Sequence, residues 1–124
     1  MKFEIEYPPT KKGKAVWNKR FGLNAYYAGK HWNERKRDAE ELHWIARAAM
    51  KRAGIRQKII ETPVKLTFLF DDGLDCSNHA IIVKAVEDAM KGWIIKDDSR
   101  KYVKSITMMF HEENCIRVIV EEIK

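Results

Sequence analysis

The segment from residue 64 to residue 91 constrains the fold more than any other part of the chain. Residues 64–70, VKLTFLF, are rich in β-branched and aromatic residues and end at an acidic turn, which predicts a buried strand. Asn78 then has the side chain of a helix N-cap. Apolar residues recur after it with helical spacing, at Ile82, Val86, Ala89 and Met90. A strand followed directly by an amphipathic helix predicts a domain in which helices pack on a sheet.

Further elements are predicted on both sides of this unit. A long helix is expected from about Asn33, a suitable N-cap, to Arg52. The remaining strands are predicted at residues 3–7, 105–110 and 115–120. The segments between are a basic loop at 10–19, an irregular aromatic stretch at 21–29, a short extended piece at 93–95 and a hairpin loop at 111–114. The expected fold class is α/β, close to α+β: one domain over residues 1–124 with a mixed sheet of about four strands and two main helices.

Composition excludes a disordered chain and an integral membrane protein. Hydrophobic residues make up 45% and charged residues 34% of the sequence, as in ordinary globular domains. No apolar stretch approaches the roughly 18 residues of a membrane span. Glu4 and Glu6 stand where a secretory signal would need basic and then apolar residues, so the protein is expected in the cytoplasm. Cys76 and Cys115 lack the paired spacing of a zinc site and are expected to be reduced thiols.

The net charge of +6 is unevenly distributed along the chain. Residues 1–60 contain 15 Lys and Arg against 6 Asp and Glu, whereas residues 61–124 contain 9 against 12. A basic half suits a polyanionic partner, and carboxylates gathered on the other half could hold a cation. Solvated helices that are simply rich in Lys and Arg would give the same counts.

The acidic residues after the central strand are candidate metal ligands. They are Asp71, Asp72 and Asp75, with Asp97 and Asp98 further along. The helix carries the chain about 20 Å away from Asp75. Six extended residues from Gly92 would carry it back by about 20 Å, so Asp98 is expected beside Asp75. Clustered carboxylates repel one another unless a cation lies among them, and oxygen ligands alone suit Mg²⁺ or Mn²⁺.

Lys84 is a candidate partner for these carboxylates. It lies on the polar face of the predicted helix, and helical side chains tilt toward the amino end. Its ammonium group could therefore approach the carboxylates or a phosphate. The alternative is an ion pair within the helix, with Asp88 at i+4 or Glu87 at i+3. Acidic turns that are merely solvated would show the same sequence.

Several short motifs follow one another in a defined order over residues 21–104. They are Asp75-Cys76-Ser77-Asn78, Lys84, Asp88-Ala89-Met90, Gly92-Trp93-Ile94-Ile95 and Asp97-Asp98. An earlier block, LNAYYAGKHW at residues 23–32, is followed by Arg35-Lys36. In order and spacing the set resembles the RusA-like Holliday junction resolvases, a family of crossover junction endodeoxyribonucleases. That family's pattern is a D-x-D-N element after a strand, a helix with a lysine and an Asp-Gly-Leu-like triplet, an apolar turn and an Asp-Asp pair.

The resemblance implies a small α/β homodimer that binds four-way or other branched DNA and nicks it with Mg²⁺ or Mn²⁺, in DNA recombination and repair. By position, Asp75 and Asp98 match the family's acidic catalytic residues, and Lys84 matches its helix lysine. The implied metal ligands are Asp75, Asp97 and Asp98. Ser77 departs from the pattern, because an aspartate is expected there. The alternative is therefore a catalytically weakened or inactive protein that binds junctions or other nucleic acid, unless Asp71, Asp72 or Asp97 compensates.

The basic half supplies the expected DNA contacts, because Lys and Arg gain affinity for phosphates by releasing counterions. Given the resemblance, these residues are Lys11, Lys12, Lys14, Lys19, Arg20, Asn24, His31, Arg35 and Lys36. Tyr26, Tyr27 and Trp32 could stack on bases, although aromatic residues at this density more often pack in a core or a dimer interface. A third possibility is a basic protein that binds RNA or a protein partner, with solvated carboxylates.

Overall fold

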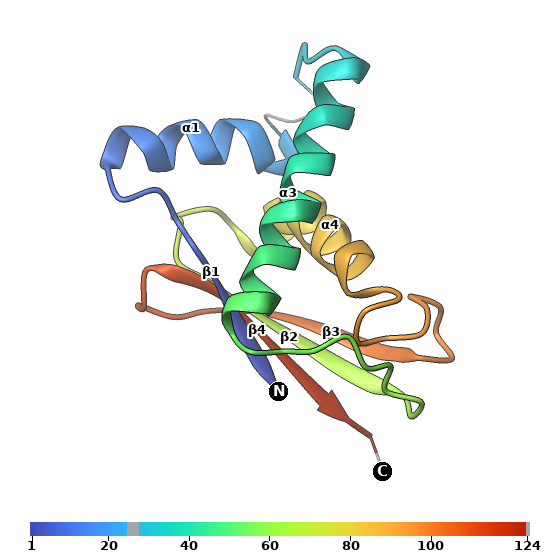
Figure 1. The fold of residues 1–124 in the computed structure, drawn as a ribbon. Coiled ribbons are helices and arrows are strands. Elements are labelled where there is room, and N and C mark those ends of the chain that lie inside the picture. The colour runs from blue at the N-terminus through green and yellow to red at the C-terminus, as the bar shows by residue number, and fades with distance from the viewer. Residues whose placement is uncertain (25–27, 124) are drawn as a thin grey trace.

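The computed structural model describes residues 1–24 and 28–123. In these residues, four strands form one mixed sheet, and three α-helices and a short 3₁₀ helix accompany it. The elements are β1 (Lys2–Glu6), α1 (Lys11–Phe21), α3 (Trp32–Arg52), β2 (Val64–Phe70), η1 (Cys76–His79), α4 (Ala80–Met90), β3 (Val103–Phe110) and β4 (Cys115–Glu122). Figure 1 shows α3 and α4 together over one face of the sheet. The expected α+β class with a mixed four-stranded sheet is confirmed, with one more helix than expected.

The sheet has the strand order β1-β4-β2-β3. β2 is parallel to β3 and antiparallel to β4, which in turn pairs with β1. The predicted hairpin at residues 111–114 is therefore wrong, because β2 lies between β3 and β4. The loop instead crosses the carboxyl end of β2, where the His111 N–H donates to the Phe70 carbonyl at 3.1 Å. It spans two strand spacings, about 10 Å, and lies directly on the acidic turn after β2.

The core lies between the sheet and the two long helices. Alternate residues of β2 point into it, so Leu66, Phe68 and Phe70 have no exposed surface. Leu42 and Met50 of α3, among others, cover them and are equally buried. Each such side chain contributes roughly 1.5 to 3 kcal/mol through burial. This face of the sheet fixes the position of the turn that follows β2.

Residues 10–19, expected to be a basic loop, are part of helix α1. Thr10 caps the helix, because its side chain accepts a hydrogen bond from the Gly13 N–H at 2.9 Å. Trp17 and Phe21, one helical turn apart, are buried and lie edge to face with ring centroids 4.6 Å apart. Only these two residues of α1 are buried, so the lysines around them obscured the helical pattern.

The segment after α4 is a turn rather than the extended piece expected at residues 93–95. Gly92 adopts φ +77°, and the N–H groups of Ile94 and Ile95 both donate to the Met90 carbonyl, at 3.0 and 3.2 Å. The Arg47 side chain donates to the Ala89 carbonyl and caps this end of α4. The chain therefore returns over a shorter distance than an extended segment would cover. None of the described helices is long and apolar enough to cross a membrane.

Candidate functional site

Asp72 anchors the turn after β2. Its carboxylate lies 2.7 Å from Nε2 of His79, and neither side chain has exposed surface. The Leu74 N–H donates to the same carboxylate at 2.9 Å, and the Tyr7 hydroxyl approaches it at 3.4 Å. Burial opposes ionisation, yet the hydrogen bond from His79, with that from Leu74, holds the pKa of Asp72 below its usual value. Asp72 is thus engaged within the protein, where its contact with His79 holds the turn.

His79 has a hydrogen-bond acceptor at each ring nitrogen. Nε2 faces Asp72, and Nδ1 lies 3.1 Å from the Cys76 carbonyl. The ring also stacks on Phe70 with centroids 3.7 Å apart. Sequence reasoning did not link His79 to Asp72, because they are seven positions apart and the secondary structure changes between them.

Asp75 and Ser77 are both exposed, just before and within η1. Asp75 lines a hollow of about 490 Å³, together with Asp71, Glu112 and His111. Asp71 accepts a hydrogen bond from the Asn114 N–H at 2.9 Å. Asp75 has no side-chain partner among the residues described, so its carboxylate is open to a ligand. The structure therefore surrounds Asp75 with acidic residues of its own turn and of the loop after β3.

Lys84 lies between two carboxylates on the surface of α4. Its Nζ is 2.7 Å from Oδ2 of Asp98 and 3.1 Å from Oδ1 of Asp88. Both the expected approach to the acidic pair and the alternative i+4 ion pair are therefore present. The hydrogen bond to Asp98, followed by that to Asp88, raises the pKa of Lys84, and the Lys84 bond lowers the pKa of Asp98. Lys91 adds a second cation, 3.7 Å from Asp98.

Asp75 and Asp98 are not joined by a hydrogen bond or an ion pair. Asp75 lies nine positions before Lys84 along η1 and α4, and Asp98 lies against Lys84 because the turn after α4 is short. Across residues 1–24 and 28–123, no group of three or more His, Cys, Asp or Glu is arranged to hold a metal ion. The donor chemistry of Asp75, Asp97 and Asp98 suits Mg²⁺ or Mn²⁺, and a shared ion stays a prediction.

The expected DNA-binding residues of α1 differ in availability. Lys11, Lys12 and Lys19 are exposed, while Nζ of Lys14 lies 5.0 Å from the centre of the Tyr7 ring. Arg20 is engaged within the protein, at 2.8 Å from Asp38 and 2.5 Å from Glu41. Asp38 is buried and also binds Lys30 at 2.7 Å. Arg20 therefore fixes α1 against α3, which leaves three exposed lysines on α1 for phosphates.

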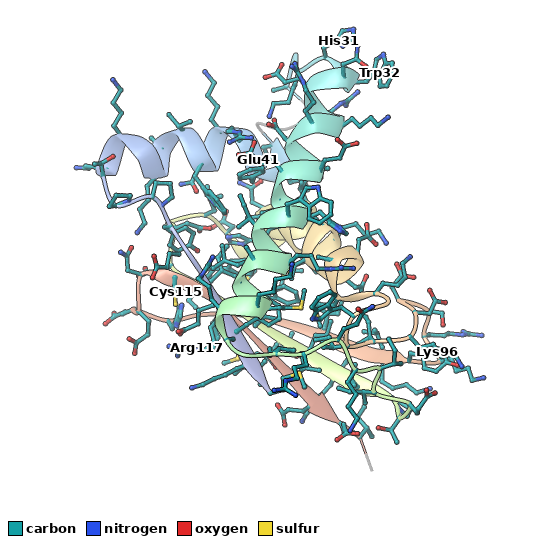
Figure 2. All side chains as sticks on the ribbon, in the orientation of Figure 1. His31, Trp32, Glu41, Lys96, Cys115 and Arg117 are labelled. Atoms are coloured by element: carbon teal, nitrogen blue, oxygen red, sulfur yellow. The ribbon has the colours of Figure 1, made fainter. Side chains whose placement is uncertain are left out.

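The remaining expected contacts lie around the start of α3. His31 caps this helix, because its Nδ1 accepts from the Asn33 N–H at 3.2 Å. Trp32 is 60% exposed beside it, and Figure 2 shows both residues at the outer tip of α3. Lys36 is exposed and Arg35 half-buried. Tyr26 and Tyr27 lie outside the described residues.

The aromatic block and the acidic turn meet in space. The main-chain N–H of Asn24 donates to Oδ1 of Asn78 at 2.9 Å. The Asn18 side chain donates to the Asp72 carbonyl at 3.0 Å. The end of α1 is thereby tied to the turn that carries Asp75. Residues of the two motif blocks, more than fifty positions apart, form one surface.

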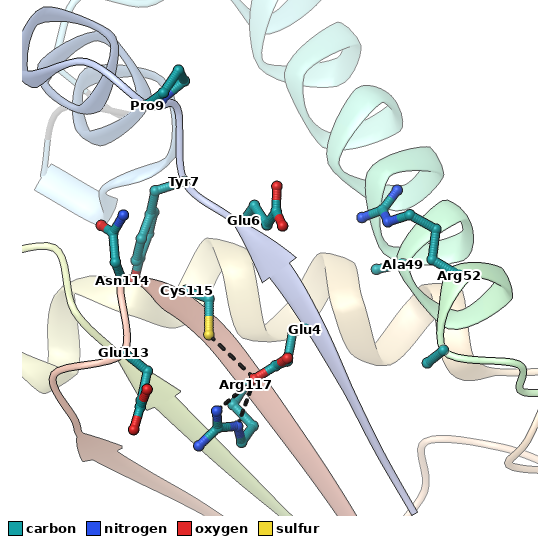
Figure 3. A pocket seen from close by; sticks show the side chains of 11 residues that line it. Glu4, Glu6, Tyr7, Pro9, Ala49, Arg52, Glu113, Asn114, Cys115 and Arg117 are labelled. Atoms are coloured by element: carbon teal, nitrogen blue, oxygen red, sulfur yellow. Dashed lines mark hydrogen bonds and ion pairs between the residues drawn. The ribbon is translucent and has the colours of Figure 1, made fainter.

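A separate cleft of about 610 Å³ lies between β1, the end of α3 and the loop before β4 (Figure 3). Glu4 accepts from Arg117 at 2.6 Å and from the Cys115 thiol at 3.5 Å, while Glu6 and Arg52 also line the cleft. Burial, followed by the bond to Glu4, raises the pKa of Cys115 to about 11, so this free thiol is protonated at neutral pH. Sequence reasoning gave no signal for this cleft.

Neither a scan against protein-family models nor a search of curated proteins found a match to this chain. The fold and site define a small α+β domain in which Lys84 of α4 pairs with Asp98 of the following turn, and an acidic turn lies beside the basic helix α1.

Proposed function

We propose that this protein is a structure-selective endodeoxyribonuclease that nicks four-way or other branched DNA in recombination or repair, as a cytoplasmic homodimer that uses Mg²⁺ or Mn²⁺. The contact between Lys84 and Asp98 carries the proposal. These residues are fourteen positions apart and belong to separate motifs of the RusA-like pattern, yet their side chains are 2.7 Å apart. Contact between two motif residues supports the pattern as more than a chance similarity.

The chain's own charged residues have distinct proposed roles. Asp75, Asp97 and Asp98 would hold the metal ion, which supplies an activated water and neutralises charge on the phosphate when bound. Lys84 would offset negative charge on the phosphate as the P–O bond breaks. Its raised pKa keeps the ammonium charged at neutral pH, and Asp98 orients it. Because Asp98 would serve both Lys84 and the ion, metal binding must compete with this ion pair.

The proposed DNA surface combines α1 with the start of α3. Lys11, Lys12 and Lys19 present three exposed ammonium groups along α1. Lys36 and His31 extend the surface on α3, while the Asn24–Asn78 contact connects it to the acidic turn. Phosphates held on α1 would therefore lead toward Asp75.

Incubation of the protein with a labelled four-way junction and Mg²⁺ or Mn²⁺ tests the activity. We expect nicks that require the metal and are lost in Asp98→Asn. The matched control is Glu121→Gln, which removes one exposed carboxylate that pairs with Lys65, at 3.7 Å. It should nick like the wild type. Tight junction binding without nicking under either metal would overturn the nuclease assignment.

The second candidate is a junction-binding protein with weak or absent catalysis. Ser77 favours it, because the expected carboxylate is missing and Asp72, three residues from Asp75, is committed to His79. Ser77 is exposed, so an aspartate there should be tolerated. Under this candidate, Ser77→Asp creates or raises nicking while junction affinity stays near that of the wild type. Equal affinity for junction and linear duplex at the same salt would instead favour a general basic interaction protein.

A further inference from the structure

The turn between α4 and β3 carries a second basic surface, distinct from that of α1. We define it as Lys58, Lys96, Arg100, Lys101 and Lys104, all of which are exposed. Four of the five lie within residues 96–104, in the half of the chain whose net charge is negative. Figure 2 shows Lys96 far from His31 and Trp32, at the other side of the domain. The second basic surface is therefore not an extension of the α1 surface.

Backbone hydrogen bonds hold this surface together. The N–H groups of Tyr102 and Val103 both donate to the Ser99 carbonyl at 2.9 Å, and the Val64 N–H donates to the Tyr102 carbonyl at 2.8 Å. Lys58 is brought alongside because its N–H donates to the Trp93 carbonyl at 2.9 Å. The cations thus project from a turn fixed to β2 and from a neighbouring segment.

An aromatic ring lies among these cations. Nζ of Lys96 is 5.7 Å from the centre of the Tyr102 ring, and Nζ of Lys101 is 5.4 Å from it. Both distances fall within the range of cation–π contacts. Tyr102 is itself half-buried, so one fixed ring contacts two ammonium groups of the surface.

Carboxylates neutralise little of this charge. Only Lys96 has a carboxylate partner among the residues described, Glu61 at 3.9 Å, and both of these side chains are more than half exposed. Asp98 lies in the same turn but forms its ion pairs with Lys84 and Lys91 instead. Adjacent unpaired cations repel one another, and a polyanion relieves this repulsion and releases their counterions.

We infer that the second basic surface binds the sugar–phosphate backbone of a nucleic acid, beside the Asp97-Asp98 pair. The identification of this nucleic acid as DNA rests on the proposed function. Phosphates on α1 and phosphates on the second basic surface would then lie on either side of the candidate site. A branched substrate presents backbone over such a wide surface, whereas a short duplex end does not.

The test compares Arg100→Gln/Lys104→Gln with the control Lys2→Gln/Arg52→Gln, which also removes one lysine and one arginine from exposed positions, on β1 and at the end of α3. The probe is a labelled four-way junction, and affinity is measured between about 0.05 and 0.2 M salt. Two lost phosphate contacts should lower the slope of log K against log salt by up to about 1.8 and weaken binding about tenfold or more at 0.1 M salt. The control should keep the wild-type slope.

Thermal unfolding of both variants establishes that any loss of affinity is not a loss of folding. An unchanged slope in Arg100→Gln/Lys104→Gln, with a wild type that binds and nicks, would overturn this inference alone. A reduced slope with no nicking by the wild type would support the inference and overturn the proposed nuclease activity. A wild type that binds no nucleic acid would overturn both.

Discussion

Replacement of Asp72 by Asn should destabilise the protein severely. The carboxylate and the His79 ring are both fully buried and 2.7 Å apart, and His79 has acceptors at both nitrogens. Asn would remove the carboxylate that Nε2 of His79 faces, and removal of one partner of a buried pair of this kind costs about 3 to 5 kcal/mol. For a domain of this size, roughly 3 to 4 °C of melting temperature corresponds to each kcal/mol, so the midpoint should fall by about 10 to 20 °C.

The matched control is the neighbouring Asp71→Asn, read out by circular dichroism on heating and by urea unfolding. Asp71 is half-buried and accepts one hydrogen bond from the Asn114 N–H, so its loss should cost only about 1 kcal/mol. The double replacement Asp72→Leu/His79→Phe removes both polar partners and should recover part of the stability lost in Asp72→Asn. If Asp72→Asn melts no lower than Asp71→Asn, the Asp72–His79 pair does not hold the turn.

Three further outcomes follow from the same contacts. Because folding lowers the pKa of Asp72, the stability that this group contributes is present above pH about 4 and is lost as pH falls through the folded value. Acid unfolding of the wild type should therefore be steeper than that of Asp72→Asn, and equal slopes would refute the assignment. The Cys115 thiol, with its pKa raised to about 11, should react with a maleimide at pH 7.5 more slowly than the thiol of an unfolded peptide. Mass spectrometry of Cys76→Ser protein, in which Cys115 is the one remaining cysteine, would measure this rate. Trp17→Ala should cost about 3 to 5 kcal/mol on urea unfolding if α1 packs as described, whereas exposed Val16→Ala should cost less than about 1 kcal/mol.

The parts of the fold that could be predicted were those with a strong apolar period. Residues 64–70 and the helix ending at Arg52 carry enough buried positions to set their type and, within a few residues, their limits. Helix α1 could not be predicted, because only Trp17 and Phe21 are buried in it and two positions do not define a helical period. The loop at 111–114 was read as a hairpin because four polar residues between two strands usually form one. Its crossing over β2 depends on sheet order, which local sequence does not encode.

The contacts of the candidate site could likewise be predicted only in part. The approach of Lys84 to the acidic pair followed from the direction of helical side chains and was found. The expected return of Asp98 to Asp75 stays a prediction; it assumed an extended segment, whereas residues 92–95 form a turn. The pairing of Asp72 with His79 depends on tertiary packing around Phe70 and has no local signal.

The five aspartates differ in their contacts within the protein, and these contacts indicate which of them best tests the proposed chemistry. Asp72 holds the fold through His79, Asp71 holds the loop after β3, and Asp98 holds Lys84. The side chain of Asp75 has no hydrogen-bond or ion-pair partner in residues 1–24 and 28–123. A carboxylate that contributes no ion pair to the fold can be removed at little cost in stability, so Asp75→Asn separates chemistry from folding more cleanly than replacement of Asp71, Asp72 or Asp98. Loss of metal-dependent nicking in Asp75→Asn at an unchanged melting temperature would assign the residue to catalysis, and unchanged nicking would exclude it.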